Sequence, residues 1–335
     1  MAISTAAFPV AERADPSQSL RRAVELGFSG CHFHSIFEID PQLSRERMTA
    51  VAQQASVLGQ TLTAGLLFLS PTHPSRSPEV ILAGRGHWDN GIHAVLDAAH
   101  EAGVMNLLAV VGKPEDRTSG PGRWKEQLSA TVRLLSGVRG HLCENGQKII
   151  LKSHPEISSQ ELEEVIERVG ADAVGVGFDP INVVARGENP VDAVSRLSGC
   201  ITQIYIDDMV MLKDAGDLIR VPVPFGAGQI EWDQILSVLA ARRTSPDWIL
   251  DLKKDPTRIR VNDSEWLAAQ GMSHDSARYC RALASGTQGL QANARGESAL
   301  DAVREPTDRL SASIQELKRS FPAMRRDISV QLESK

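Results

Sequence analysis

A strand-then-helix unit recurs along the chain and limits the folds that are available to it. Each unit begins with a short apolar segment rich in β-branched residues, which predicts a buried strand, and continues into a stretch with apolar residues at helical spacing. The segments predicted as strands are residues 4–10, 30–34, 61–69, 106–111, 148–154, 173–179, 201–208 and 248–253. About eight units with short connections predict an α/β fold, a closed (β/α)8 TIM barrel. An open doubly wound sheet is the alternative, although no Gly-x-Gly-x-x-Gly follows the first strand.

The connecting segments predict helices that alternate with these strands. They are expected at residues 15–27, 44–58, 88–102, 124–143, 158–169, 191–197 and 232–241. Glycine is a poor residue inside a helix, so Gly137 and Gly140 are expected to interrupt the helix at 124–143.

From residue 286 onward the strand-helix rhythm stops. Gly, Gln, Asn, Ser and charged residues dominate there, and Leu310, Ile314, Leu317 and Phe321 then mark one apolar face of a late helix. We therefore divide the chain into a barrel at 1–285 and a partly helical C-terminal extension at 286–335. The late helix either covers the barrel floor, packs on a second subunit in a homo-oligomer, or belongs to a solvated tail.

Charge and composition exclude several classes of partner. The formal net charge is −6, with no Lys- or Arg-rich block, which argues against nucleic acid. The four cysteines are scattered without a Cys-x-x-Cys pair, which is typical of reduced thiols rather than a zinc knuckle or a disulfide framework. The N-terminus lacks the pattern of a secretion signal, and no apolar run is long enough to span a bilayer. These features predict a cytoplasmic protein with no membrane partner.

The fifth predicted strand carries the most informative polar residues. It runs from Lys148 through Lys152 and His154 and stops at Pro155, which cannot donate a backbone hydrogen bond. Side chains alternate across a strand, so Ile150, Lys152 and His154 are expected to face the same way. An ammonium and an imidazole would then lie together at the carboxyl end of the strand, where α/β proteins bind ligands.

Polar residues also follow the other strands. Alternation lets Tyr205 and Asp207 share one face, with Asp208 on the other, and it separates Lys253 from Lys254 in the same way. Glu38 is either a loop carboxylate or a base, and Arg76 either pairs a substrate phosphate or carboxylate or is exposed. The candidates for catalysis are Lys152, His154, Asp179, Tyr205 and Asp251, and those for substrate binding are His32, His34, Glu38, Arg76, Asp207 and Lys253.

Two motifs resemble those of the xylose isomerase-like superfamily of sugar isomerases, epimerases and dehydratases. Asp179 and Asn182 match the Asp-x-x-Asn that commonly ends its sixth strand, and Gly226, Gly228 and Trp232 match the Gly-x-Gly-x-x-x-Trp that follows its seventh. The likeness is clearest from residue 148 to 255. It implies a barrel fold and sugar chemistry assisted by Mn²⁺, Mg²⁺, Co²⁺ or Zn²⁺, bound by two Glu, an Asp and a His.

The chain departs from that metal site at several positions. Lys152 stands at the fifth-strand Glu position and Tyr205 at the seventh-strand His position, while the eighth strand offers Asp251 or, with a two-residue shift, Lys253. A protonated ammonium cannot ligate a metal ion and repels it. The usual four-ligand site is therefore predicted to be broken.

Three mechanisms remain open at this point. In the first, Lys152 replaces the metal ion and stabilises an enediolate, with His154 as proton shuttle and Tyr205 as hydroxyl donor. In the second, Lys152 forms a Schiff base with a carbonyl substrate. In the third, a metal site is rebuilt from moved ligands, namely Asp179, His154, Asp207 and Asp251.

The leading hypothesis is an enzyme that transfers a proton next to the carbonyl of a sugar or a polyhydroxylated keto compound. Isomerisation, epimerisation, dehydration and carbon–carbon lysis all belong to this chemistry. The competing hypothesis is a non-catalytic sugar- or partner-binding barrel that has lost the metal site. A nucleic-acid endonuclease of the same superfamily is disfavoured by the acidic balance of the chain.

Overall fold

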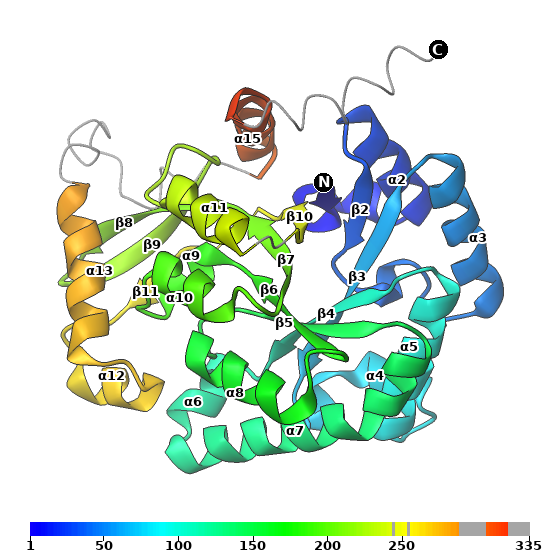
Figure 1. Ribbon diagram of the computed structural model, residues 1–335, viewed down its shortest axis with the longest axis horizontal. Coiled ribbons are helices and arrows are strands. Elements are labelled where there is room, and N and C mark those ends of the chain that lie inside the picture. Colours follow the sequence, from blue (N-terminus) through cyan, green and yellow to red (C-terminus); the bar gives the residue numbers. More distant parts are fainter. Residues whose placement is uncertain (243–244, 253–254, 288–305, 321–335) are drawn as a thin grey trace.

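Eight parallel strands close into a barrel in the computed structural model, which describes residues 1–242, 245–252, 255–287 and 306–320 (Figure 1). Each barrel strand pairs with the next along the chain, and the last pairs with the first. The predicted (β/α)8 barrel is confirmed, and the open sheet is not formed. The barrel strands are β1 (Ala2–Ser4), β2 (Gly30–Phe33), β3 (Thr61–Leu69), β4 (Asn106–Val111), β5 (Lys148–Lys152), β6 (Val174–Phe178), β7 (Ile201–Ile206) and β10 (Asp247–Leu250).

Helices surround the barrel strands on the outside (Figure 1). No described helix is long and apolar enough to cross a membrane. The helices up to β10 are α1 (Val10–Arg13), α2 (Pro16–Glu25), α3 (Arg45–Val57), α4 (Pro78–Ala83), α5 (Trp88–Glu101), α6 (Pro114–Thr118), α7 (Pro121–Glu144), α8 (Ser159–Val169), α9 (Pro180–Ala185), α10 (Pro190–Leu197) and α11 (Trp232–Ala241). Short 3-10 turns are η1 (Thr5–Ala7), η2 (Ile36–Glu38) and η3 (Pro74–Arg76). After β10 come α12 (Ser264–Gln270), α13 (His274–Gly286) and α15 (Pro306–Ser320).

Alternation along β5 separates two layers of the core. Ile149 and Leu151 point outward and pack in the large core between strands and helices. Ile150 points inward and packs with Leu108, Tyr205 and other residues inside the barrel. Lys152 is two residues further along on the same inward face, so the strand delivers its ammonium to the barrel mouth.

Two predicted element boundaries were wrong. The first strand ends at Ser4, and η1 and α1 follow where a strand to residue 10 was expected; Pro9, just before α1, has no backbone N–H to extend a ladder. Helix α7 is continuous from Pro121 to Glu144. A Cβ on Gly137 or Gly140 would meet no atom within 4 Å, while Leu135 and Leu142 are buried on the core. Packing of that apolar face outweighs the weak helix preference of glycine.

A hairpin after β7 was not predicted. Strands β8 (Asp208–Asp214) and β9 (Asp217–Val223) pair antiparallel, and β11 (Thr257–Ile259) joins them as a third strand. Ala215 and Gly216, the two residues between β8 and β9, both have positive φ angles, 49° and 89°, as a tight hairpin turn requires. This small sheet stands at the C-terminal end of the barrel, beside the candidate site.

Helix α15 lies at the barrel mouth rather than at the floor. Its residues contact η1, which directly follows β1, and Ser313 Oγ accepts a hydrogen bond of 3.0 Å from the backbone N–H of Phe225, in the segment between β9 and α11. In Figure 1, α15 lies between the N-terminal segment and α11. Leu310 and Leu317 are buried, as their spacing predicts. Phe321 and the rest of the predicted extension, residues 288–305 and 321–335, lie outside the described residues. The division at residue 285 therefore stays a prediction.

Candidate functional site at the barrel mouth

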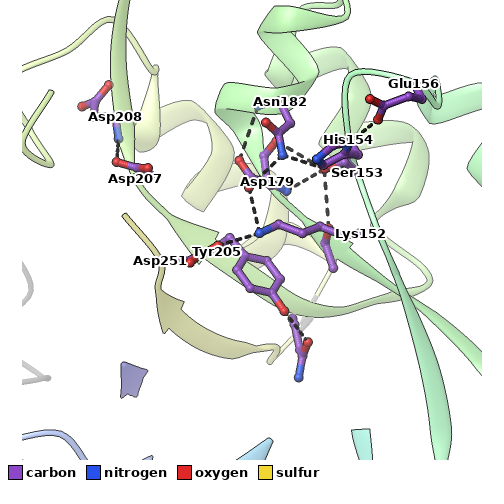
Figure 2. A network of polar contacts seen from close by, with 12 residues as sticks. Lys152, Ser153, His154, Glu156, Asp179, Asn182, Tyr205, Asp207, Asp208 and Asp251 are labelled. Carbon is purple, nitrogen blue, oxygen red and sulfur yellow. Dashed lines mark hydrogen bonds and ion pairs between the residues drawn. The ribbon is translucent and has the colours of Figure 1, made fainter. Parts of the chain in front are cut away.

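Lys152 lies between two carboxylates at the mouth of the barrel. Its Nζ is 2.6 Å from Oδ2 of Asp251, which follows β10, and 3.2 Å from Oδ2 of Asp179, which follows β6 (Figure 2). All three side chains are buried, with exposed fractions of 3% for Lys152, 7% for Asp251 and 0% for Asp179. Three strands thus bring one ammonium and two carboxylates together in a site that is closed to most water. The two carboxylates compensate the charge of the buried ammonium.

Tyr205 supports the ammonium with its ring. Lys152 Nζ lies 3.9 Å from the centre of the Tyr205 ring, a cation–π distance. The Tyr205 hydroxyl points away and donates a 3.0 Å hydrogen bond to Gln203 Oε1. Burial, together with the carboxylates of Asp251 and Asp179, raises the pKa of Tyr205 well above its ordinary value, so the phenol stays protonated. Gly177 on β6 makes room for the ring, since a Cβ there would lie 2.9 Å from Tyr205 Cε2.

Asp179 has a second, structural task. It is the N-cap of α9, and its Oδ1 accepts from the backbone N–H of Asn182 at 3.4 Å. The Asn182 side chain donates to Asp179 Oδ2 at 3.1 Å and to the carbonyl of Ser153 at 3.1 Å. Ser153 Oγ in turn accepts from the backbone N–H of Asp179 at 2.7 Å. The carboxylate is therefore held rigidly in front of Lys152.

His154 forms a pair with Glu156. The imidazole Nδ1 contacts Glu156 Oε2, and the Glu156 side chain is 2% exposed while that of His154 is 28% exposed. A carboxylate at Nδ1 favours the tautomer with hydrogen on that nitrogen, which leaves Nε2 as a proton acceptor. This arrangement, a buried acid that orients a partly open imidazole, is typical of a general base.

A small cavity is lined by five of the predicted residues, while Asp179 and Tyr205 lie behind Lys152 and do not line it. It has a volume of about 120 Å³. His32 on β2 is 1% exposed, its Nδ1 lies 2.9 Å from Thr63 Oγ1, and its ring meets the Tyr205 ring edge-on at 5.8 Å. His34 lies at the outer rim. The cavity is lined by His32, His34, Gly65, Phe68, Leu108, Val110, Lys152, His154 and Asp251.

The neighbouring acids of β7 and β8 play different parts. Asp207 is buried, and Figure 2 shows it beside Asp208, apart from Lys152. The Asp208 carboxylate accepts hydrogen bonds from the backbone N–H groups of Met209 at 2.8 Å, Gly226 at 3.1 Å and Ile230 at 3.3 Å. Asp208 thus fixes the turn that contains Gly226 and Gly228, before α11, which is called the glycine turn below. Burial raises its pKa to about 6.

Three residues predicted to bind substrate do not line the cavity. Glu38 accepts from the Thr5 hydroxyl at 2.7 Å and from the backbone N–H of His34 at 3.2 Å, so it organises the loop after β2. The guanidinium of Arg76 pairs with Asp116 at 2.6 Å. Asp207 is the third predicted substrate-binding residue that does not line the cavity. Lys253 lies outside the described residues.

Two arginines that the sequence did not suggest stand near the mouth. Arg220 on β9 is 3% exposed and donates to Asn182 Oδ1 at 3.3 Å and to Thr257 Oγ1 at 2.6 Å. Burial lowers the pKa of Arg220, the carboxylates of Asp179 and Asp207 oppose that shift, and Arg309 of α15 adds to it. Arg309 is itself 0% exposed. The hairpin and α15 therefore bring two cations to the acidic side of the mouth.

The fold and the glycine turn agree with a match to a known protein family. The family model described as "Xylose isomerase-like TIM barrel" matches residues 20–273, which is most of the chain. The chain belongs to the xylose isomerase-like TIM barrel family. The resemblance inferred from Asp179, Asn182 and the glycine turn is thereby confirmed.

Similar proteins share the following identities with the chain. The uncharacterized protein YihM of Escherichia coli (strain K12) is 25% identical over 153 residues, which are 44% of this chain and about half (47%) of YihM. D-psicose 3-epimerase from Clostridium cellulolyticum H10, solved with D-tagatose, is 14% identical, with a TM-score of 0.58 over 86% of this chain and 98% of the epimerase. The IOLI protein, solved with a zinc atom, is 19% identical, with a TM-score of 0.55 over 85% of this chain and 98% of that protein. At these identities the two solved structures show the fold alone.

The residues at the mouth do not fit a divalent cation of the kind bound in the IOLI structure. The position between the carboxylates of Asp179 and Asp251 is taken by Lys152 Nζ, and Nδ1 of His154 is already paired with Glu156. Asp207 lies apart from them. Within the described residues, no group of three or more His, Cys, Asp or Glu side chains is arranged to hold a metal ion. A fixed ammonium stands where a cation would be needed.

Proposed function

We propose that this chain is an enzyme that moves a proton next to the carbonyl of a sugar or a polyhydroxylated keto compound, by isomerisation, epimerisation or a related dehydration or lysis. The single observation that carries the proposal is the Lys152 ammonium, held by two buried carboxylates at the carboxyl ends of the barrel strands and facing a cavity lined with histidines. Active sites of such barrels lie at this end.

Lys152 supplies the electrophilic part of the site. When a proton leaves the carbon beside a carbonyl, negative charge moves to the carbonyl oxygen. A buried ammonium that donates a hydrogen bond to this oxygen stabilises the enolate, because the charge is already in place and water is excluded. Asp179, Asp251 and the Tyr205 ring fix its direction, so little reorganisation is required.

His154 supplies the base. Its Nε2 takes the proton from carbon, and the buried Glu156 carboxylate stabilises the imidazolium that forms. Return of that proton to the neighbouring carbon gives isomerisation, return of a proton to the opposite face gives epimerisation, and departure of a β-hydroxyl gives dehydration. His32 on β2 and His34, directly after it, also line the cavity and are placed to bind substrate hydroxyls.

Solvent exchange at carbon tests the proposal without knowledge of the final product. Keto sugars and polyhydroxylated ketones are incubated with the protein in D₂O, and loss of the proton signal beside the carbonyl is followed by NMR. Lys152→Met should slow exchange on the order of a hundredfold to a thousandfold, the usual cost of losing an oxyanion donor. Lys148→Met is the matched control, because Lys148 starts the same strand, does not line the cavity, and donates a 2.7 Å hydrogen bond from Nζ to the carbonyl of Ala171. Exchange that persists in Lys152→Met, or no exchange across the panel, would contradict the proposal.

Two competing hypotheses remain distinguishable. A Schiff base on Lys152 requires a neutral amine, whereas two carboxylates within 3.2 Å favour the ammonium; borohydride with a carbonyl substrate would leave a mass adduct on Lys152 if that mechanism operated. A non-catalytic sugar- or partner-binding barrel that has lost the metal site is the second candidate, and the position of Lys152 Nζ between the carboxylates of Asp179 and Asp251 favours it, because this leaves no place for a metal ion there. Calorimetric binding of a sugar without any proton exchange would support the binding barrel.

A further inference from the structure

A second cleft is lined by residues of α6, α8, α10 and α12 and of the start of α7. Figure 1 shows these helices on the outside of the barrel. Its volume is about 660 Å³, and it shares no lining residue with the cavity at Lys152. Two buried arginines line it: Arg117 of α6 is 6% exposed, and Arg186, at the end of α9, is 5% exposed. Buried guanidinium groups at the wall of an open cleft require an explanation, because burial of a charge is costly unless the charge is paired.

The two arginines differ in their bonding. Arg117 Nε donates to the carbonyl of Glu156 at 2.5 Å, its Nη2 pairs with Glu161, and its guanidinium stacks 4.2 Å from the Trp124 ring centre. By contrast, Nε and Nη1 of Arg186 are buried and have no hydrogen-bond partner among the described residues. Burial lowers the pKa of Arg186, and nearby carboxylates oppose that shift only through space.

Those nearby carboxylates are bonded to other groups. Glu161 accepts from the Trp124 indole at 2.9 Å and from the backbone N–H of Ser158 at 2.8 Å, in addition to Arg117. Glu188 accepts from the backbone N–H of Ser159 at 3.1 Å. The Glu156 carboxylate is paired with His154. Among the described residues, the Arg186 charge therefore has no hydrogen-bonded partner at Nε or Nη1, and the residue lines the cleft.

Arg117 and Arg186 both approach Gly271 at the wall of the cleft. Gly271 ends α12 with a φ of 64°, and a Cβ built on it would lie in close contact with both side chains, 3.3 Å from Arg117 Nη1 and 3.4 Å from Arg186 Nη2. The two guanidinium groups therefore lie near each other, and all three residues line the cleft. An oxyanion in the cleft beside Gly271 is close to both groups, and planar guanidinium groups are well suited to the oxygens of phosphate and carboxylate.

We infer that Arg186 and Arg117, beside Gly271 at the wall of the cleft, form a binding site for a small oxyanion, either a phosphate or a carboxylate group, that is separate from the barrel mouth. The anion compensates the buried charge of Arg186 as Asp179 and Asp251 compensate that of Lys152. The site is independent of the proposed enzymatic reaction, so either one can fail without the other.

Thermal unfolding and calorimetry of the full chain test this site with inorganic phosphate and acetate, against chloride at matched ionic strength. We expect a saturable rise in Tm of a few degrees for the wild type with one of the two oxyanions, since a ligand that binds the native state alone stabilises it by mass action. Arg186→Met should abolish the rise. Arg139→Met is the matched control, because it removes the same charge from an exposed arginine that pairs with Asp172.

The outcomes separate a binding site from a structural role. An Arg186-dependent rise supports the site, and the more effective anion identifies the ligand class. An equal rise in Arg186→Met, or no effect of either oxyanion on the wild type beyond chloride, overturns it. Arg186→Lys keeps the charge but not the fork of donors, and should retain a weakened rise if Arg186→Met does not fold. The wild-type titration alone decides if neither variant folds.

Discussion

Lys152 and Arg186 are both buried cations, but the protein treats them differently. Lys152 has two carboxylates within 3.2 Å and an aromatic ring beneath it, whereas Nε and Nη1 of Arg186 meet no acceptor among the described residues. The first charge is compensated within the chain, so it is fixed in direction and suited to act on a bound substrate. The second is left for an external anion. Removing Lys152 should therefore change stability and catalysis without added ligand, whereas removing Arg186 should change the response of the protein to oxyanions.

The largest effect is expected when the compensated charge is removed. Lys152→Met leaves the carboxylates of Asp179 and Asp251 buried without their common cation, and we expect the free energy of unfolding to fall by about 3–5 kcal/mol at neutral pH. Urea unfolding measures this change. Adding Asp251→Asn to the variant should restore part of the loss, because it removes one of the stranded charges. A loss no greater than that of Lys148→Met, at the half-buried start of the same strand, would show that the three groups do not stabilise one another.

Asp208 is a buried carboxylate, so its effect on stability can be compared with that of the buried cations. Its carboxylate is bonded to backbone N–H groups, and burial raises its pKa from 3.8 to about 6. The native state therefore binds the proton more tightly than the unfolded chain, so the contribution of Asp208 to stability is greatest below about pH 4 and is lost as the pH rises to about 6. Relative to Asp208→Asn, the wild type should lose about 2–3 kcal/mol over that range. Parallel pH profiles in urea unfolding would contradict this.

These contrasts also show which parts of the molecule local sequence could predict. Seven of the eight barrel strands were predictable because β-branched runs and their glycine or proline ends are local signals, whereas β1 has only three residues and was placed at 4–10. Alternation along β5 then placed Lys152 and His154 on one inward face. Arg220 was missed because the hairpin was missed, although Asp214-Ala215-Gly216-Asp217 carries a turn signal.

Other parts of the site depend on contacts that no local pattern encodes. Arg309 reaches the mouth from a helix that follows the whole barrel, and the position of α15 is set by packing against η1 and the β9–α11 segment. Arg186 ends a six-residue helix, and its surroundings come from α6, α8 and α12. The sequence also does not predict the hydrogen bond from the Tyr205 hydroxyl to Gln203. Alternation places both side chains inside the barrel, but it does not determine which way the hydroxyl points.

Glu156 joins the two regions, since its carboxylate bonds His154 and its carbonyl accepts from Arg117. Glu156→Gln keeps the backbone contact but removes the charge that stabilises a protonated His154. We expect proton exchange in D₂O to slow by about tenfold to a hundredfold, as is usual when the partner of a functional histidine is changed. The Tm shift with oxyanion should stay unchanged. A loss of the oxyanion shift with normal exchange would reverse the assignment of the two regions.

The smallest effect concerns Gly271, where an added methyl group crowds two guanidinium groups without removing either charge. Gly271→Ala places a methyl group 3.3 Å from Arg117 Nη1 and 3.4 Å from Arg186 Nη2, at a φ of 64° that costs an alanine about 1 kcal/mol. Gly146→Ala is a matched control, because Gly146 has the same φ of 64° and its Cβ would meet Met105 Cε at 3.6 Å, away from both arginines. Both variants should lose about 1 kcal/mol in urea, but only Gly271→Ala should lose the oxyanion shift. If both variants keep the Tm shift with oxyanion, the anion does not bind beside Gly271, and it must reach Arg186 from another side of the cleft.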